Sequence, residues 1–327
     1  MSTYSRVRDL PLVVDGYELE PLEREVARNF TLRRTEVVLR GAGHEGRGEE
    51  VDYDPAAQQR FQERRGELPL VGEHTLDSYS VLQAGQTEYR RWALESAALD
   101  LALKQAGLSL AEAVGREQRP VRFVVSTRVA NVEPWLELYP ALEFKLDPDT
   151  DWTDEIVARV AATGRVQTLD FKGVYRLEFG SPPDPGLYTR IAAAFPDVWL
   201  EDPALTAETS AALAGVRDRI TWDAAVHEWS DVEALPFRPR CLNCKPSRFG
   251  SVRRLFDFYD RCEQAGIALY GGGQFELGHG RDQIQLLASL FHPDTPNDVA
   301  PSGFNAVTPV PGLPQSPLDL GAPSPGF

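Results

Sequence analysis

From the start of the chain to about residue 85, apolar and polar positions alternate with a period of two. The pattern runs through 11–19 and 35–41 and ends in a glycine-rich stretch at 41–50. This period is typical of strands with one buried face, so we expect a small antiparallel sheet with a turn. The segment 89–106 instead places apolar residues at helical spacing over several turns, and Gly107 stands where such a helix would end.

Beyond residue 120 the pattern changes to short β-rich runs, each followed by a helical segment. The runs cover 121–126, 142–146, 166–171, 198–201, 220–223, 241–245 and 268–271. The helical segments cover 154–162, 185–195, 207–214, 232–235, 251–265 and 281–290. This alternation predicts a parallel sheet, and so many repeats favour a closed barrel over an open sheet. The stretch 301–327 is rich in proline and glycine and is read as a tail, either ordered by contacts or disordered.

Composition narrows the class of protein. The 327 residues are 42% apolar and 25% charged, which is ordinary for a globular protein. No apolar run approaches the roughly 20 residues that span a bilayer, and a formal net charge of −15 argues against a nucleic-acid or anionic-membrane binder. The N-terminus lacks the apolar core of a secretory signal and the three cysteines are an odd number, so we expect a cytoplasmic protein with reduced thiols. Cys241 and Cys244 form a CxxC motif inside a predicted strand, and we assign them no zinc or redox role.

Charged residues stand at the ends of the predicted barrel strands, which is where active sites form in such barrels. They recur at intervals of about one strand–helix unit: Lys145, Asp170, Glu201, Asp223, Lys245 and Glu276. Three carboxylates on neighbouring strands would supply the hard oxygen ligands that suit Mg²⁺. The two lysines would accept and donate protons, since burial and the charge of a metal both lower the pKa of an ammonium group. A divalent cation would also offset the charge that develops on a carboxylate when its α-carbon loses a proton, so the set fits enolate chemistry.

Each of these positions also has a purely structural explanation. Acids at strand ends commonly cap the following helix, which would account for Asp202 and Asp223, and lysines there are often solvated. We favour one shared site because the charged residues recur in register over successive units.

Four segments resemble the fourth to seventh barrel strands of the muconate-lactonizing-enzyme subgroup of the enolase superfamily. They are Trp-Leu-Glu-Asp-Pro at 199–203, Ile-Thr-Trp-Asp at 220–223, Asn-Cys-Lys-Pro-Ser-Arg-Phe-Gly at 243–250 and Gly-Gly-Gln-Phe-Glu-Leu-Gly-His-Gly-Arg at 272–281. The helix that includes Glu95 and Asp100 is similar to the linker helix of that family, and Gly48 with Glu49 resembles the strand-end Gly-Glu of its capping domain. The resemblance implies an α/β protein with an N-terminal α+β capping domain and linker helix at 1–115, a (β/α)7β TIM-like barrel at 116–300 and a Pro/Gly-rich C-terminal tail at 301–327.

The same resemblance implies roles for individual residues. Asp170, Glu201 and Asp223 match the three metal ligands, with Mg²⁺ as the cofactor. Lys245 matches the sixth-strand lysine and Lys145 the second lysine of the second-strand Lys-x-Lys motif, so the two would face opposite sides of the α-carbon of a small-molecule carboxylate substrate. Capping-domain loops near 15–30 and 50–55 would cover this substrate. Family members are commonly homo-oligomers, and we expect the same here.

Three positions depart from the family pattern. Glu143 stands where the first lysine of Lys-x-Lys is expected, Lys172 replaces an asparagine of the third strand, and Ala224 follows the predicted ligand where an acid is common. We favour a compensating ion pair between Glu143 and Lys172. The alternatives are that Lys172 binds the substrate carboxylate or that it replaces Lys145 as the second acid/base.

Two further residues are candidates for substrate contact. Glu276 is interpreted as a barrel-floor or loop-orienting acid in preference to a base. His279 is interpreted as structural in preference to a residue that contacts substrate or relays a proton. The predicted function is Mg²⁺-dependent abstraction of a proton α to a carboxylate through a stabilised enolate, with racemisation or epimerisation of an amino-acid derivative or dipeptide in first place. The alternatives are an o-succinylbenzoate synthase-like dehydratase or cycloisomerase, and a non-catalytic barrel retained for binding.

Overall fold

The computed structural model describes residues 2–27, 30–175 and 182–327. Its N-terminal part is built on an antiparallel sheet in the order β2 (Gly16–Ala27), β3 (Phe30–Gly41) and β4 (His44–Glu50). Ala42 and Gly43, both with positive φ, make the tight turn between β3 and β4. The antiparallel sheet expected from the period-two pattern is therefore present, and β2 occupies most of the 15–30 range that we expected to form a loop. The tip of the β2–β3 hairpin lies outside the described residues.

The long helix α3 (Glu88–Ala106) packs across β4. The glycines of β4 permit this contact, because a Cβ added at Gly46 would lie 2.3 Å from the carbonyl oxygen of Ala97. At its C-terminal end α3 stops at Gly107, which adopts the left-handed conformation with φ of 67°. Both ends agree with the helix predicted from the sequence to within one residue.

Other short elements complete the N-terminal region. They are η1 (Tyr4–Arg6), β1 (Pro11–Val14), α1 (Pro55–Glu63), β5 (Gly72–Thr75), α2 (Leu76–Leu82) and α4 (Leu110–Val114), and β1 pairs with β5. Two helices before residue 85, α1 and α2, were not singled out from the sequence, which predicted only the sheet in this stretch. Both helices are too short for a clear 3.6-residue period, but their N-terminal caps are visible in the sequence: Asp54 begins α1, and Thr75 with Ser78 forms a capping box at α2.

A parallel barrel forms the rest of the molecule. Its strands are β6 (Val125–Thr127), β7 (Phe144–Leu146), β8 (Val166–Asp170), β9 (Trp199–Glu201), β10 (Ile220–Thr221), β11 (Cys241–Cys244) and β12 (Ala268–Gly271). β6 to β10 form one sheet and β11 pairs with β12, while the Asn243 N–H donates to the Trp222 carbonyl at 3.0 Å and joins the two sheets. The circle closes through Asn297 and Asp298, which bridge to Phe123 and Gly272 respectively. Each strand predicted beyond residue 120 is present, and the (β/α)7β fold is confirmed.

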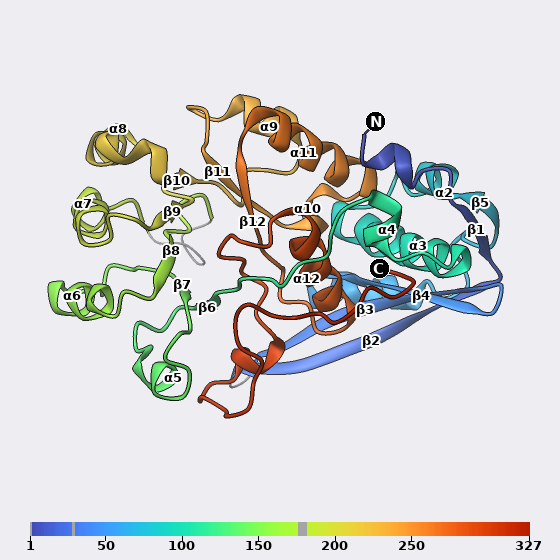
Figure 1. Ribbon diagram of the computed structural model, residues 1–327, viewed down its shortest axis with the longest axis horizontal. Helices are drawn as coiled ribbons and strands as arrows, with labels where there is room; N and C mark the ends of the chain where they lie inside the picture. The colour runs from blue at the N-terminus through green and yellow to red at the C-terminus, as the bar shows by residue number, and fades with distance from the viewer. Residues whose placement is uncertain (1, 28–29, 176–181) are drawn as a thin grey trace.

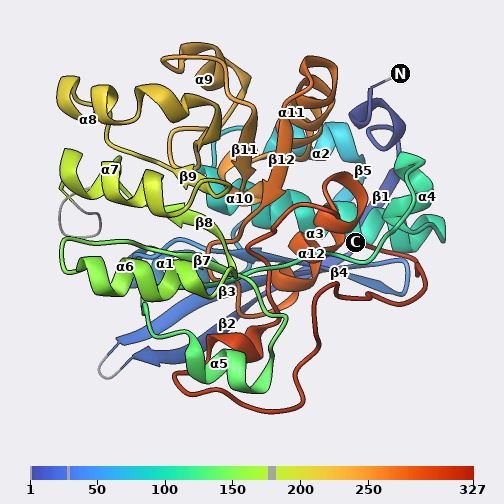
Figure 2. The same ribbon diagram turned by 60° about the vertical axis from the view of Figure 1, so that its left-hand side comes forward.

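Helices cover the outside of the barrel (Figures 1 and 2). They are α5 (Glu133–Leu138), α6 (Asp154–Ala162), α7 (Pro185–Ala194), α8 (Ala207–Ala212), α9 (Trp229–Ala234), α10 (Pro246–Phe249), α11 (Val252–Ala265) and α12 (His279–Phe291), with the 3-10 turns η2 (Ala214–Arg219) and η3 (Ser302–Asn305). In Figure 1, α5 to α9 spread around one side of the strands, while α3, α4 and the β2–β4 sheet lie towards the other side. The sequence pattern missed α5 and α10, both short. In the part of the chain that the structure describes, none of the helices combines the length and hydropathy of a membrane span.

Contacts order the C-terminal stretch 301–327. The Leu318 N–H donates to the Val121 carbonyl at 2.7 Å, and Ser316 Oγ accepts from the Phe123 N–H at 2.9 Å. At the end of the chain, Phe327 packs edge-on against Trp92 of α3. The tail is therefore ordered by contacts with the rest of the protein, which was one of the two alternatives expected from the sequence.

Candidate active site

A cavity of about 670 Å³ opens at the C-terminal ends of the barrel strands. Its charged inner wall consists of Lys145, Asp147, Asp170, Lys172, Lys245 and Asp298. Its outer wall includes Tyr53 from the N-terminal region and Gln274, Phe275 and Arg281 from the segment around the start of α12. Tyr53 agrees with the expectation that residues near 50–55 approach the substrate. With Arg128 added, basic side chains outnumber acidic ones, which favours an anionic ligand.

Three buried carboxylates gather at the ends of β8 and β9. Asp170 and Glu201 are register partners on these strands, and Asp202 follows with a φ of 45°. Among the described residues, the ligand oxygens of these three acids lie within 4.8 Å of one another. Hard oxygen donors at this spacing fit a divalent ion such as Mg²⁺.

Asp223, the third metal ligand expected from the sequence, makes a different set of contacts. Its Oδ2 lies 2.7 Å from Lys245 Nζ, and its Oδ1 accepts from Arg248 at 2.5 Å. The neighbouring Asp202 accepts hydrogen bonds from the backbone N–H groups of Asp223 and Ala224, each at 2.9 Å. Asp202 therefore holds the end of β10 in place, and Asp223 lies between the carboxylate cluster and the side chains of β11 and α10.

Lys145 projects from β7 into the carboxylate cluster and is only 2% exposed. Its Nζ lies 2.5 Å from Glu201 Oε1 and 3.2 Å from Asp170 Oδ2. Burial alone would disfavour the ammonium ion, but Glu201 and Asp170 outweigh it and raise the pKa of Lys145 well above its usual value. Lys245 behaves in the same way, because Asp223 outweighs burial and raises its pKa. The lowering of lysine pKa values expected from the sequence therefore requires the charge of a bound ion.

Lys172 lies at the mouth of the site and pairs with two aspartates. Its Nζ is 2.9 Å from Asp170 Oδ2 and 3.0 Å from Asp147 Oδ2. The proposed ion pair between Glu143 and Lys172 was wrong. Glu143 lies two residues before Lys145, nearer the N-terminal end of the barrel, where Arg122 forms a bidentate pair with it at 2.7 Å. The charge that compensates Lys172 comes instead from Asp147, which follows the end of β7.

Glu276 and His279 lie behind the cavity wall. Glu276 is 3% exposed and its Oε1 accepts from the Gln274 N–H at 2.8 Å, as expected of an acid that orients the loop. His279 is the first residue of α12, and its Nδ1 lies 2.8 Å from Glu36 Oε1 of β3. This pairing raises the pKa of His279 and joins α12 to the N-terminal sheet. Neither residue is among the cavity-lining residues described, so their substrate-binding role stays a prediction.

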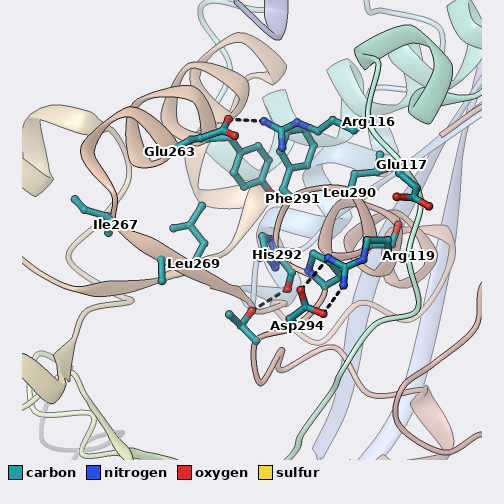
Figure 3. A pocket seen from close by; sticks show the side chains of 15 residues that line it. Arg116, Glu117, Arg119, Glu263, Ile267, Leu269, Leu290, Phe291, His292 and Asp294 are labelled. Atoms are coloured by element: carbon teal, nitrogen blue, oxygen red, sulfur yellow. Dashed lines mark hydrogen bonds and ion pairs between the residues drawn. The ribbon is translucent and has the colours of Figure 1, made fainter.

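A second cavity, of about 480 Å³, lies at the opposite end of the barrel (Figure 3). Ala268 at the start of β12 lines it, together with residues that precede the first barrel strand. Its two arginines are already paired: Arg116 with Glu263 at 2.6 Å, and Arg119 with Asp294 at 2.8 Å. The other cavity lies at the C-terminal ends of the parallel strands, where barrel active sites form, so it is the stronger candidate for chemistry.

Several residues of the site were not singled out from the sequence. They are Asp147, Tyr175, Arg248 and Asp298, and Asp202 was considered only as a helix cap. Asp147 follows Lys145 by two residues, and residues two apart in a strand lie on the same face. Asp202 is adjacent to Glu201. Tyr175, Arg248 and Asp298 reach the site through loops and α10, for which no periodic pattern gives a signal.

Comparisons with known proteins agree with this architecture. Residues 5–113 match the N-terminal domain, and residues 117–306 the C-terminal domain, of a family described as domain of unknown function DUF8230. A stretch of 164 residues is 31% identical to an o-succinylbenzoate synthase of Pectobacterium atrosepticum, covering 49% of this chain and 42% of that protein. The match thus spans less than half the length of this relative.

Solved structures show the same fold. A dipeptide epimerase from Methylococcus capsulatus, complexed with Mg and a dipeptide, superposes with a TM-score of 0.73 over 91% of this chain and 93% of that chain, at 18% identity. A muconate cycloisomerase from Pseudomonas fluorescens gives a TM-score of 0.67 over 88% of this chain and 87% of that chain, also at 18% identity. The chain therefore belongs to the DUF8230 family and has the fold of the enolase superfamily, which confirms the resemblance to the muconate-lactonizing-enzyme subgroup.

Proposed function

We propose that the protein removes a proton from the carbon next to a carboxylate of a small-molecule substrate, through an enolate intermediate. The observation that carries the proposal is the arrangement of charges in the 670 Å³ cavity. Buried carboxylates at the ends of β8 and β9 lie between lysines that reach the cavity from β7 and from the end of β11.

The donor set supports Mg²⁺ as the cofactor. Asp170 and Glu201 would hold the ion together with Asp202, whose oxygens complete the cluster, or with Asp223, which the sequence resemblance favours. When bound, Mg²⁺ would supply positive charge where negative charge develops on the substrate carboxylate. The protein's own contribution is to bury these acids, to fix them through the β8–β9 register and to keep the cavity lined with basic groups.

The lysines would move the proton. β7 and β11 lie on opposite sides of the barrel, separated by β8 to β10 in one direction and by β12, the segment at Asn297 and Asp298, and β6 in the other. Lys145 and Lys245 would therefore approach the α-carbon from opposite faces, one as base and the other as acid. Lys172 is the alternative to Lys145, since it also lines the cavity and its side chain is 21% exposed against 2% for Lys145.

Acid/base groups on opposite faces allow inversion at the α-carbon. Racemisation or epimerisation of an amino-acid derivative or dipeptide is therefore our first assignment, and the fold shared with a dipeptide epimerase is consistent with it. The second candidate is a dehydratase that acts on an o-succinylbenzoate precursor, which the 31% identity over 164 residues to an o-succinylbenzoate synthase favours.

Deuterium incorporation tests the proposal directly. The protein is incubated with Mg²⁺ in D₂O with pooled N-acylamino acids and dipeptides, and then with the precursor that dehydrates to o-succinylbenzoate. Loss of the α-proton is followed by NMR. We expect exchange that disappears in EDTA and in Lys245→Ala. The outcome that would remove the proposal is silence of the wild-type protein across all these substrates, which would favour a barrel retained for binding.

A further inference from the structure

The loop between β12 and α12 forms one wall of the candidate active site. Gly273, Gln274 and Phe275 of this loop line the cavity. Phe275 has a φ of 62°, a left-handed conformation that is unfavourable for a residue with a bulky side chain. Such a conformation persists only where surrounding contacts hold it, so the contacts that impose it determine the shape of this wall.

Besides Glu276 within the loop, two residues of the N-terminal sheet make these contacts. Arg34 of β3 donates from Nη2 to the Gln274 carbonyl oxygen at 2.6 Å, immediately before Phe275. Glu49 of β4 accepts from the Leu277 N–H at 2.6 Å and from the Gly278 N–H at 2.9 Å, just after it. Arg34 is fully buried and Glu49 is 1% exposed, so water does not weaken either contact.

Glu49 and its register partner Glu36 also meet the start of α12: Glu49 accepts from the Gly278 N–H, and Glu36 accepts from the His279 N–H at 3.1 Å. Gly278 is the N-cap residue of α12 and has no side chain with which to satisfy the first N–H groups of the helix. Glycine is needed there and at Gly280, because a Cβ added at Gly280 would lie 2.8 Å from Glu49 Oε2. The Glu49 carboxylate thus occupies the space left by the missing side chains of Gly278 and Gly280, at the positive end of the dipole of α12.

We propose that Glu49, assisted by Arg34, is a positioning residue that fixes the loop 273–278 and so sets how tightly the cavity fits its substrate. The predicted effect of Glu49 on substrate turnover rests on the proposed function, whereas its predicted effect on the loop does not. Burial, followed by the charge of nearby Glu276, raises the pKa of Glu49 to about 7, whereas the hydrogen bonds from the Leu277 and Gly278 N–H groups act in the opposite direction and favour the carboxylate.

The adjacent Glu50 offers a matched control. It too is fully buried, and its pKa is likewise raised to about 7. However, its carboxylate bonds to Gln58 of α1 and to the Asp52 N–H, within the N-terminal region itself. Glu50→Gln therefore alters a buried acid on the same strand without touching the loop 273–278.

The test compares Glu49→Gln with Glu50→Gln in the full chain. Glutamine can accept only one of the two loop N–H groups, so we expect amide hydrogen exchange in residues 272–280 to become about tenfold faster in Glu49→Gln, and not in Glu50→Gln. Because the loop supplies neither metal ligands nor lysines, Mn²⁺ affinity should stay within about twofold of wild type. KM should rise about tenfold while kcat changes by less than about twofold.

Hydrogen exchange decides the inference even if the proposed function fails, because it needs no substrate. Equal exchange of the loop in Glu49→Gln and wild type would overturn it, as would the same acceleration in Glu50→Gln. A fall in kcat at unchanged KM would also contradict a positioning role. If Glu49→Gln does not fold, Gly280→Ala displaces the carboxylate without removing it and should give the same pattern.

Discussion

Lys145 occupies the position where a cation is needed among Asp170 and Glu201, and Lys145→Met tests this directly. The ammonium lies 2.5 Å and 3.2 Å from the two carboxylates, and all three side chains are at most 2% exposed. Removing one partner of a buried ion pair leaves uncompensated charge and costs about 3–5 kcal/mol. We therefore expect Lys145→Met to lose about 3 kcal/mol of unfolding free energy in EDTA.

Magnesium should reverse much of this loss. An ion at a concentration of about 100 times its Kd adds about 2.7 kcal/mol to the stability of the folded state. In the variant the ion would bind the same carboxylates without a repelling ammonium beside it, and unit charges about 4 Å apart interact by about 4 kcal/mol at an effective dielectric constant of 20. We expect Mg²⁺ to bind Lys145→Met at least about tenfold more tightly than wild type.

Urea unfolding with and without Mg²⁺, together with calorimetric Mg²⁺ titration, measures both quantities without a substrate. The matched control is Lys104→Met, which removes a half-buried lysine paired with Asp100 on α3 at 2.8 Å. Because the buried Asp100 keeps hydrogen bonds from the Arg47 and Phe327 N–H groups, this variant should lose less stability than Lys145→Met, and the loss should not depend on Mg²⁺. The reasoning is refuted if Lys145→Met is as stable as wild type in EDTA, or if its loss of stability is the same with and without Mg²⁺.

Three further predictions follow from particular contacts. Burial lowers the pKa of His292 to about 4, so the stability that the neutral side chain provides is present above its unfolded pKa of about 6.5 and is lost as the pH falls towards 4. His292→Gln should remove about 3 kcal/mol of this pH dependence, measured by urea unfolding, and an unchanged pH profile would contradict the prediction. Asp202→Asn and Asp223→Asn can be compared by Mn²⁺ titration. Loss of the true third ligand should lower the affinity at least about tenfold, and equal small losses would show that neither aspartate is a ligand. Glu143→Gln should destabilise the barrel by about 1–3 kcal/mol, because it breaks the bidentate pair with Arg122. A double-mutant cycle of Glu143→Gln with Arg122→Met should show a coupling free energy, and the same cycle with Lys172→Met should show none.

Much of the barrel could be predicted because each strand and helix depends mainly on residues that are close together along the chain. A strand with both faces buried reads as a short apolar run, and the residue that ends it, such as Asp170 or Glu201, is fixed by counting along the chain. α3 was predictable for the same reason, since nineteen residues at helical spacing followed by Gly107 specify both its face and its end. Short helices such as α2 and α10 have too few turns for a period to emerge.

Partners across the fold were decided by tertiary structure alone. Lys172 pairs with Asp147 and not with Glu143, because the two acids lie at opposite ends of β7 although only three residues separate them. Asp202 joins the carboxylate cluster because its backbone turns inward with a positive φ, which nothing in Glu-Asp-Pro requires. The sequence by itself determined which strands and helices form and which charges end the strands, since these depend on neighbours along the chain. The register and closure of the barrel decided which of those charges meet, because they bring together side chains that lie far apart in sequence.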